Sequence, residues 1–129
     1  MGVAERRKMK HTINYNEKDK VVELKVVGDV TPDEAQQMIK EVGKTLDEKG
    51  NRHFLLDFTE SPRLQMDKDA RKIIGAGAKN LDLERIAITG TTPMNRMMAK
   101  VVLALLGKGK ITKFFDTKEV AISWLKGLS

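Results

Sequence analysis

The stretch RIAITGTTPMNRMMAKVVLAL, residues 85–105, carries the pattern that decides the fold. Residues 85–89 form a short apolar run of the kind that makes a strand buried on both faces. The turn at 90–92 leads into a helix, because Thr92 can cap it and Pro93 fits the first helical position, where no amide donor is needed. A strand followed at once by a capped helix is the unit from which parallel α/β sheets are built.

Two further strand-and-helix units flank this stretch. Upstream, RHFLLDF at 52–58 is an apolar run without alternation, and helical spacing predicts a helix over 66–81. We expect the small residues at 75–78 to let this helix lie close to its neighbour. Downstream, ITKFF at 111–115 predicts a last strand, and 116–128 predicts a last helix capped by Asp116. We expect the buried face of that helix to consist of Val120, Ala121, Trp124, Leu125 and Leu128. The chain therefore alternates strands with helices, without an internal sequence repeat.

The N-terminal part differs, because it begins with two strands. Residues 11–16 and 20–27 are separated by a polar turn and predict a β-hairpin. A helix follows in which Thr31 and Glu34 are spaced for a capping box, and Gly50 ends it as a left-handed residue would.

These elements predict an α/β fold in the order ββαβαβαβα. Strands that alternate with helices favour parallel pairing with right-handed crossovers, so we expect a mixed five-stranded sheet with four helices on its faces. The hairpin supplies the antiparallel edge. We assign 11–129 to one domain and 1–10 to a flexible basic tail.

Composition excludes several classes of protein. The chain has 129 residues, of which 40% are apolar and 33% charged, as in an ordinary soluble globule. It has no Cys and two His, so disulfides, thiolate chemistry and most metal sites are not expected, and we predict no cofactor and no metal. We expect His11 and His53 to be surface or half-buried strand residues. The N-terminus shows no secretory signal, and we predict a cytoplasmic protein.

The net charge of +6 is unevenly distributed. Residues 1–20 hold six bases and three acids, and residues 93–113 hold five bases and no acid. Such asymmetry can attract nucleic acid, anionic lipid or an acidic protein, or it can simply keep the chain soluble. Only six aromatic residues are present, so we expect no specific nucleic-acid binding.

The helix predicted from residue 93 has more apolar surface than one sheet contact requires. It is too short to span a membrane. We expect its apolar sector to face the sheet and Arg96, Lys100 and Leu103 to lie on the opposite side. The apolar sector comprises Met94, Met97, Met98, Val101, Val102 and Leu105. The surplus can contact a second protein subunit, lie on a lipid surface or line a pocket for an apolar ligand, unless the chain itself covers it.

Polar side chains follow the predicted parallel strands, where ligands usually bind in such sheets. They are Asp57, Thr59, Thr89, Thr91 and Thr92, with Asp67 and Asp69 at the following helix start. Carboxylates beside hydroxyls can act as acid and base or hold a divalent cation. The simpler reading is that Asp67 caps a helix and Asp57 bonds a turn amide. No catalytic motif orders these groups, and we do not predict an enzyme.

With its elements in this order, the chain resembles the STAS superfamily (sulfate transporter and anti-sigma factor antagonist domains), and within it the SpoIIAA-like group of small prokaryotic proteins. The resemblance covers residues 11–127. It rests on VVELKVVGDVTPDEAQQMIKEV, RHFLLDFTE and RIAITGTTPMNRMMAKVVLALLGKGKITKFFDTKEVAISWLKG. The ending, with Phe115, Ala121, Trp124 and Leu125, looks especially like that group.

The resemblance implies a regulatory role, but this sequence lacks the Ser on which regulation depends in well-studied STAS proteins. Well-studied STAS members change partners when a Ser at the start of the second helix is phosphorylated. The corresponding place here resembles MDKDARK, where Lys68 and Asp69 stand instead of hydroxyls. We hypothesise that Asp69 imitates a permanent negative charge. The group is also similar in fold to CRAL-TRIO lipid carriers, which implies an apolar ligand as an alternative.

The sequence thus predicts a non-enzymatic STAS-like regulatory or protein-interaction module without the usual phosphorylatable Ser. We expect a protein partner or a homodimer. The alternative is a small carrier or sensor of an apolar, lipid-like ligand or an anionic one, and peripheral contact with an anionic membrane is a further option. The predicted interaction or ligand surface consists of Asp57, Thr59, Asp67, Lys68, Asp69, Thr91, Arg96, Lys100, Leu103 and Leu106.

Overall fold

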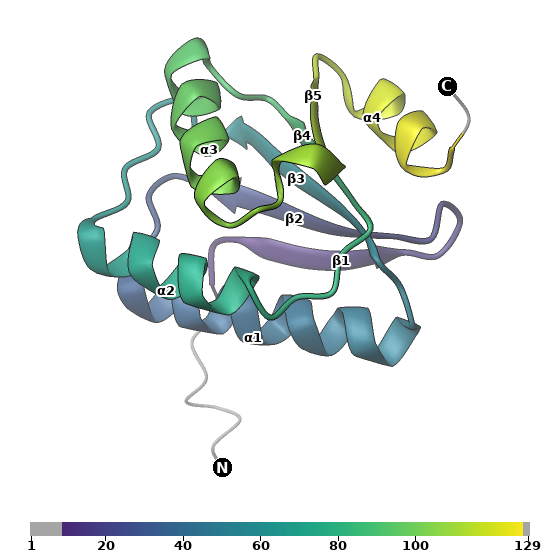
Figure 1. The fold of residues 1–129 in the computed structure, drawn as a ribbon, viewed down its shortest axis with the longest axis horizontal. Helices are drawn as coiled ribbons and strands as arrows, with labels where there is room; N and C mark the ends of the chain where they lie inside the picture. The colour runs from purple at the N-terminus through teal and green to yellow at the C-terminus, as the bar shows by residue number, and fades with distance from the viewer. Residues whose placement is uncertain (1–8, 128–129) are drawn as a thin grey trace.

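The computed structural model, which describes residues 9–127, contains one five-stranded sheet and four α-helices (Figure 1). The strands are β1 (Thr12–Asn16), β2 (Val21–Val27), β3 (His53–Glu60), β4 (Arg85–Thr89) and β5 (Thr112–Phe115). The helices are α1 (Pro32–Lys49), α2 (Lys68–Ala78), α3 (Pro93–Leu105) and α4 (Lys118–Leu125), with a 3-10 turn η1 (Gly109–Ile111) before β5.

The strands lie in the order β1-β2-β3-β4-β5, with β1 antiparallel to β2 and the others parallel. Right-handed crossovers between successive neighbours place their helices on one face of the sheet. Accordingly α1, α2 and α3 share one face, while α4, which follows the last strand, packs on the other. The predicted α/β class and element order are confirmed.

Alternation along the strands separates two cores. On the face that carries three helices, Val22, Phe54 and Ile86 lie side by side in register. Their neighbours in sequence, such as Leu55 and Ala87, point to the other face and pack under α4. Both sets are buried, as expected for central parallel strands.

Helices α1 and α2 pack unusually close together. A Cβ placed on Gly77 of α2 would overlap the side chain of Ile39 on α1, and one on Gly43 would touch Leu81. The small residues predicted to bring α2 close to its neighbour do so. As a result α1 and α2 cover only part of the sheet, and α3 stands over the remainder (Figure 1).

Two details of the sequence prediction for α4 are wrong. Its cap is Thr117, whose hydroxyl accepts from the Val120 amide, so the predicted Asp116 cap is wrong by one residue. Val120 is 52% exposed although we expected it in the core, whereas Ala121 and Leu125 are buried as predicted.

Helix α3 is rotated relative to the prediction. Met94, Met97, Val101 and Leu105, expected against the sheet, are 71%, 67%, 58% and 79% exposed. Leu103, expected on the opposite side, packs against the main core. The surplus of apolar surface is present, but on the other side of the helix.

Both ends of the chain extend beyond residues 9–127, the part that the structure describes. Residues 1–8 of the predicted tail and 128–129, including the expected core residue Leu128, lie outside the described residues. Within 9–127, no helix is both long and apolar enough to cross a membrane.

Candidate functional site

A cavity of about 420 Å³ lies between the sheet and the helices on its three-helix face. Its floor is the apolar face of the central strands, including Leu24, Leu56 and Ile88. Ile74 of α2 and Val102 of α3 belong to its walls. The volume and the apolar lining are those of a small-molecule site, for which ~300–1,000 Å³ is typical.

The cavity exists because α3 is held away from the other helices. A Cβ on Gly75 would only just reach Leu106, at 4.0 Å, so α3 touches α2 near its C-terminal end. Elsewhere the two helices are separated, and the cavity lies above the sheet between them. The inward stripe of α3 is short-chained or apolar, with Ala99, Val102 and Leu103 lining the space.

Three polar residues belong to the lining among the described residues, namely Arg71, Asn95 and Lys108. Asn95 is 7% exposed, and its amide donates to the Ser61 carbonyl over 3.0 Å. The Lys108 ammonium donates to the Leu81 carbonyl over 3.2 Å. We call these two contacts the α3 anchors, because one holds each end of the helix.

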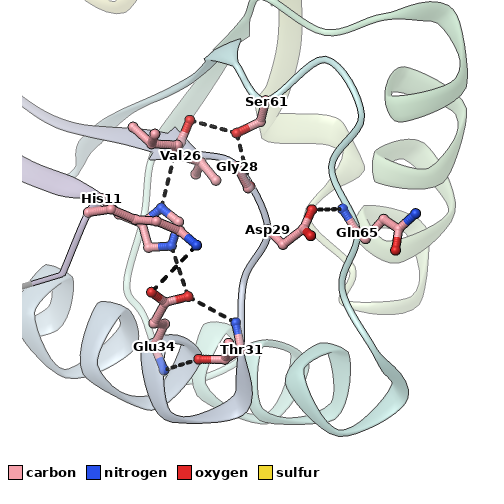
Figure 2. A network of polar contacts seen from close by, with 10 residues as sticks. His11, Val26, Gly28, Asp29, Thr31, Glu34, Ser61 and Gln65 are labelled. Atoms are coloured by element: carbon pink, nitrogen blue, oxygen red, sulfur yellow. Dashed lines mark hydrogen bonds and ion pairs between the residues drawn. The ribbon is translucent and has the colours of Figure 1, made fainter.

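The anchor at Ser61 is itself part of a buried network shown in Figure 2. The Ser61 hydroxyl lies 2.7 Å from the Val26 carbonyl and 3.1 Å from that of Gly28, joining the end of β2 to the loop after β3. Its side chain is 1% exposed. The first turn of α3 is therefore fixed to the sheet by groups that water does not reach.

A second branch of this network fixes the start of α1 (Figure 2). His11 is buried, and its Nδ1 accepts from the Val27 amide over 2.9 Å. Nδ1 thus carries no proton in the neutral ring, and Nε2 donates to Glu34 Oε1 over 3.2 Å. Glu34 and Thr31 complete the predicted capping box.

These contacts shift the titration of Glu34. Desolvation raises the pKa of its carboxyl. The Thr31 amide, the His11 ring and Lys10 together lower this pKa by more than desolvation raises it, so it falls below the ordinary value of 4.5. The carboxylate form is therefore the one that the folded state favours.

The predicted site residues do not form one cluster. Leu103 and Leu106 line the cavity. Thr91, Arg96 and Lys100 line a second, surface hollow, which shares Met97 with the cavity. The Arg96 guanidinium and the Lys100 ammonium lie 5.2 Å and 5.7 Å from the centre of the Phe114 ring. Arg96 also approaches the Thr91 hydroxyl at 3.5 Å.

The polar residues predicted at the strand ends serve local roles. Asp57 accepts from the Thr59 amide over 2.8 Å and from the Thr59 hydroxyl. Asp67 caps α2 by accepting from the Ala70 amide, and Lys68 and Asp69 are exposed in the first turn. No group of three metal-ligating side chains occurs within residues 9–127.

Sequence reasoning missed the polar points of the cavity, Arg71, Asn95 and Lys108, and it placed His11 at or near the surface. A usable signal was available in part. The small residues of α2 predict a close helix pair, and the sequential strand-and-helix units predict three helices on one face, which together leave α3 to cover a wide area.

Comparison with known proteins gives a consistent result. A family model described as SpoIIAA-like matches residues 21–126. The fold is similar to that of an uncharacterised protein of the DUF3478 family with a SpoIIAA-like fold from Shewanella loihica PV-4, with a TM-score of 0.68 and 24% identity over 93% of this chain and 98% of that one. It is also similar to the unphosphorylated anti-sigma factor antagonist SpoIIAA, with a TM-score of 0.65 and 14% identity over 91% and 98%. No curated protein matches the chain.

Proposed function

Because this chain belongs to the SpoIIAA-like family, we propose that it is a non-enzymatic regulatory module that binds an apolar ligand beneath α3. The observation that carries this proposal is the cavity of about 420 Å³. Burial of an alkyl chain there would remove apolar surface from water at ~25 cal/mol per Å². The ligand would fill space that the fold itself leaves open.

The chemistry of the site supports binding rather than catalysis. The carboxylates and hydroxyls at the strand ends are bonded to their own turns and helix starts, as Asp57 and Asp67 illustrate. By alternation along β3, Asp57 points to the face opposite Leu56 and therefore away from the cavity. By the resemblance to STAS proteins, we expect the place of the phosphorylated Ser to be the start of α2, where Lys68 and Asp69 stand, so the proposed regulation does not depend on that modification.

Calorimetric titration with 1-dodecanol, which carries no charge, tests the proposal. Ala99→Trp would place an indole in the cavity, whereas Ala104→Trp would place the same group on the exposed side of α3. We expect the unmodified protein and Ala104→Trp to bind with a negative heat-capacity change, and Ala99→Trp to bind at least about tenfold more weakly. Absence of binding to the unmodified protein, or equal binding to all three, would contradict the proposal.

A second candidate function is association through the outer face of α3. It is favoured by Met94 and Leu105, which are exposed and do not line the cavity, together with Met97 and Val101, which are exposed and also belong to its lining. Methionine side chains adapt to varied surfaces and are common at such contacts. The occupant we propose is a second copy of the chain.

Light scattering distinguishes this candidate. Leu105→Glu introduces a charge on the outer face of α3, and Val120→Glu introduces the same charge at an exposed apolar position of α4. We expect a dimer mass for the unmodified protein and for Val120→Glu, and a monomer mass for Leu105→Glu. The same mass for all three proteins would count against association through α3.

A further inference from the structure

The charges that line the cavity have one sign. Arg71 and Lys108 are the ionisable residues of its described lining, and both are cationic. No carboxylate belongs to that lining. A chain that ends in an anion would find a partner there, whereas a chain that ends in a cation would have to give up hydration without one.

Arg71 is better placed than Lys108 to receive such an anion. Lys108 is half-buried, and its ammonium is occupied by the Leu81 carbonyl at 3.2 Å. Arg71 lies in the first half of α2, lines the cavity and is exposed, which puts it at the rim. Among residues 9–127 it donates one hydrogen bond, from its backbone amide to the Asp67 carbonyl. Its guanidinium donors remain available for a planar oxyanion.

The surroundings of Arg71 do not cancel its charge. On α2, Lys68 and Lys72 are cations near it, and Asp67 and Asp69 are anions. The Asp67 carboxylate already accepts from the Ala70 amide over 2.8 Å as the cap of the helix. With Arg71 included, three cations and two anions lie in or next to the first turns of α2, so the net charge at the rim is positive.

From these contacts we propose that the ligand is a single-chain amphiphile with an anionic head. Its chain lies between α3 and the sheet, and its carboxylate or phosphate head meets the Arg71 guanidinium at the rim. This inference rests on the proposed cavity function and adds the chemical class of the ligand. Since the head lies at an exposed rim, its ion pair is screened by salt and strengthens binding by only about fivefold.

The test compares chains of equal length with different heads. Calorimetric titration below the critical micelle concentration would use dodecanoate, dodecyl phosphate, 1-dodecanol and dodecyltrimethylammonium. We expect at least one of the two anions to bind about fivefold more tightly than the alcohol, and the cation to bind most weakly. Which anion gains more identifies the head as a carboxylate or a phosphate.

Two variants separate Arg71 from general surface charge. Arg71→Met removes the rim cation, and Lys72→Met removes its exposed neighbour, which does not line the cavity. We expect Arg71→Met to bind the anion only as tightly as the alcohol, and Lys72→Met to keep the difference. Should Arg71→Met fail to fold, the anion affinity of the unmodified protein, relative to that of the alcohol, must still fall as salt is added.

The outcomes separate the two levels of the proposal. Equal binding of anions and alcohol by the unmodified protein overturns the anionic head and leaves the cavity function intact. Binding of none of the four chains overturns the cavity function and this inference with it. Loss of the anion preference in Lys72→Met as well as in Arg71→Met overturns the assignment to Arg71.

Discussion

At the scale of single residues, the imidazole of His11 connects parts of the chain that are far apart in sequence. It accepts from the Val27 amide and donates to Glu34, so the end of β2 and the start of α1 share one buried ring. Glu34 then satisfies the Thr31 amide at the helix start. These bonds hold α1 in place, and Met38 of this helix lines the cavity.

This network predicts an acid-sensitive part of the stability. Because the folded-state pKa of Glu34 is lowered, its contribution is present above the ordinary pKa of 4.5 and is lost as pH falls through the lower, folded-state value. Glu34→Gln should therefore lower the free energy of unfolding at neutral pH by about 1 kcal/mol and less in acid.

Denaturant titrations across this pH range measure the difference. Glu48→Gln, an exposed position on the same helix, serves as the control and should differ little from the unmodified protein. A difference between Glu34→Gln and the unmodified protein that stays constant down to pH values well below 4.5 would show that Glu34 titrates as an ordinary carboxyl.

Gly90, in the turn between β4 and α3, is required for two reasons. Its φ of 76° is in the left-handed region, and a Cβ there would overlap the backbone nitrogen of Thr59. Gly90→Ala should lower the free energy of unfolding by about 2 kcal/mol. Thermal melts of both variants measure the effect. At Gly109 a Cβ would meet nothing within 4 Å, so Gly109→Ala should not change the free energy of unfolding. Equal effects would contradict the close approach at Gly90.

At the scale of elements, α3 shows why a helical wheel can assign the wrong face. The wheel counts apolar side chains, and several of the largest on α3, such as Met94 and Leu105, are exposed. The rotation follows instead from the α3 anchors, Asn95 to Ser61 and Lys108 to Leu81, which join residues 34 and 27 positions apart. Long-range polar contacts of this kind leave no periodic signal in the sequence.

The anchor at Lys108 can be tested directly. Lys108→Met keeps most of the apolar stem and removes the bond to the Leu81 carbonyl, at a cost of about 1 kcal/mol. Amide hydrogen exchange in the C-terminal half of α3 should become faster, while exchange in the sheet should not change. Lys110→Met, at an exposed position, is the control. Unchanged exchange in α3 would mean that Lys108 does not hold the helix.

The elements themselves were largely predictable from local signals. The capping box at Thr31 and Glu34, the cap at Thr92 with Pro93, and the left-handed Gly50 all occur as predicted, because each depends on neighbours in sequence. The Asp116 cap was wrong because Thr117, one residue later, offers an equivalent oxygen. A pocket for an apolar ligand was one of several options that the sequence left open, and it could not be selected because the cavity depends on how far apart α2 and α3 lie.

At the scale of the whole molecule, topology accounts for the cavity. Sequential parallel strands place three crossover helices on one face, and Gly77 of α2 lets that helix lie close against Ile39 of α1. Helix α3 alone then covers the rest, held at its two ends. A fold assembled in this way leaves a cavity above the apolar sheet, which is the basis of the proposed binding function.

The measurement that tests this account most directly is the pattern of nuclear Overhauser effects between bound 1-dodecanol and the methyl groups of the protein. We expect contacts from the alkyl chain to Ile74, Ile88 and Val102, which line the cavity. Contacts confined to Met94 and Leu105, on the outer side of α3, or no contacts at saturating ligand, would contradict a binding site beneath the helix.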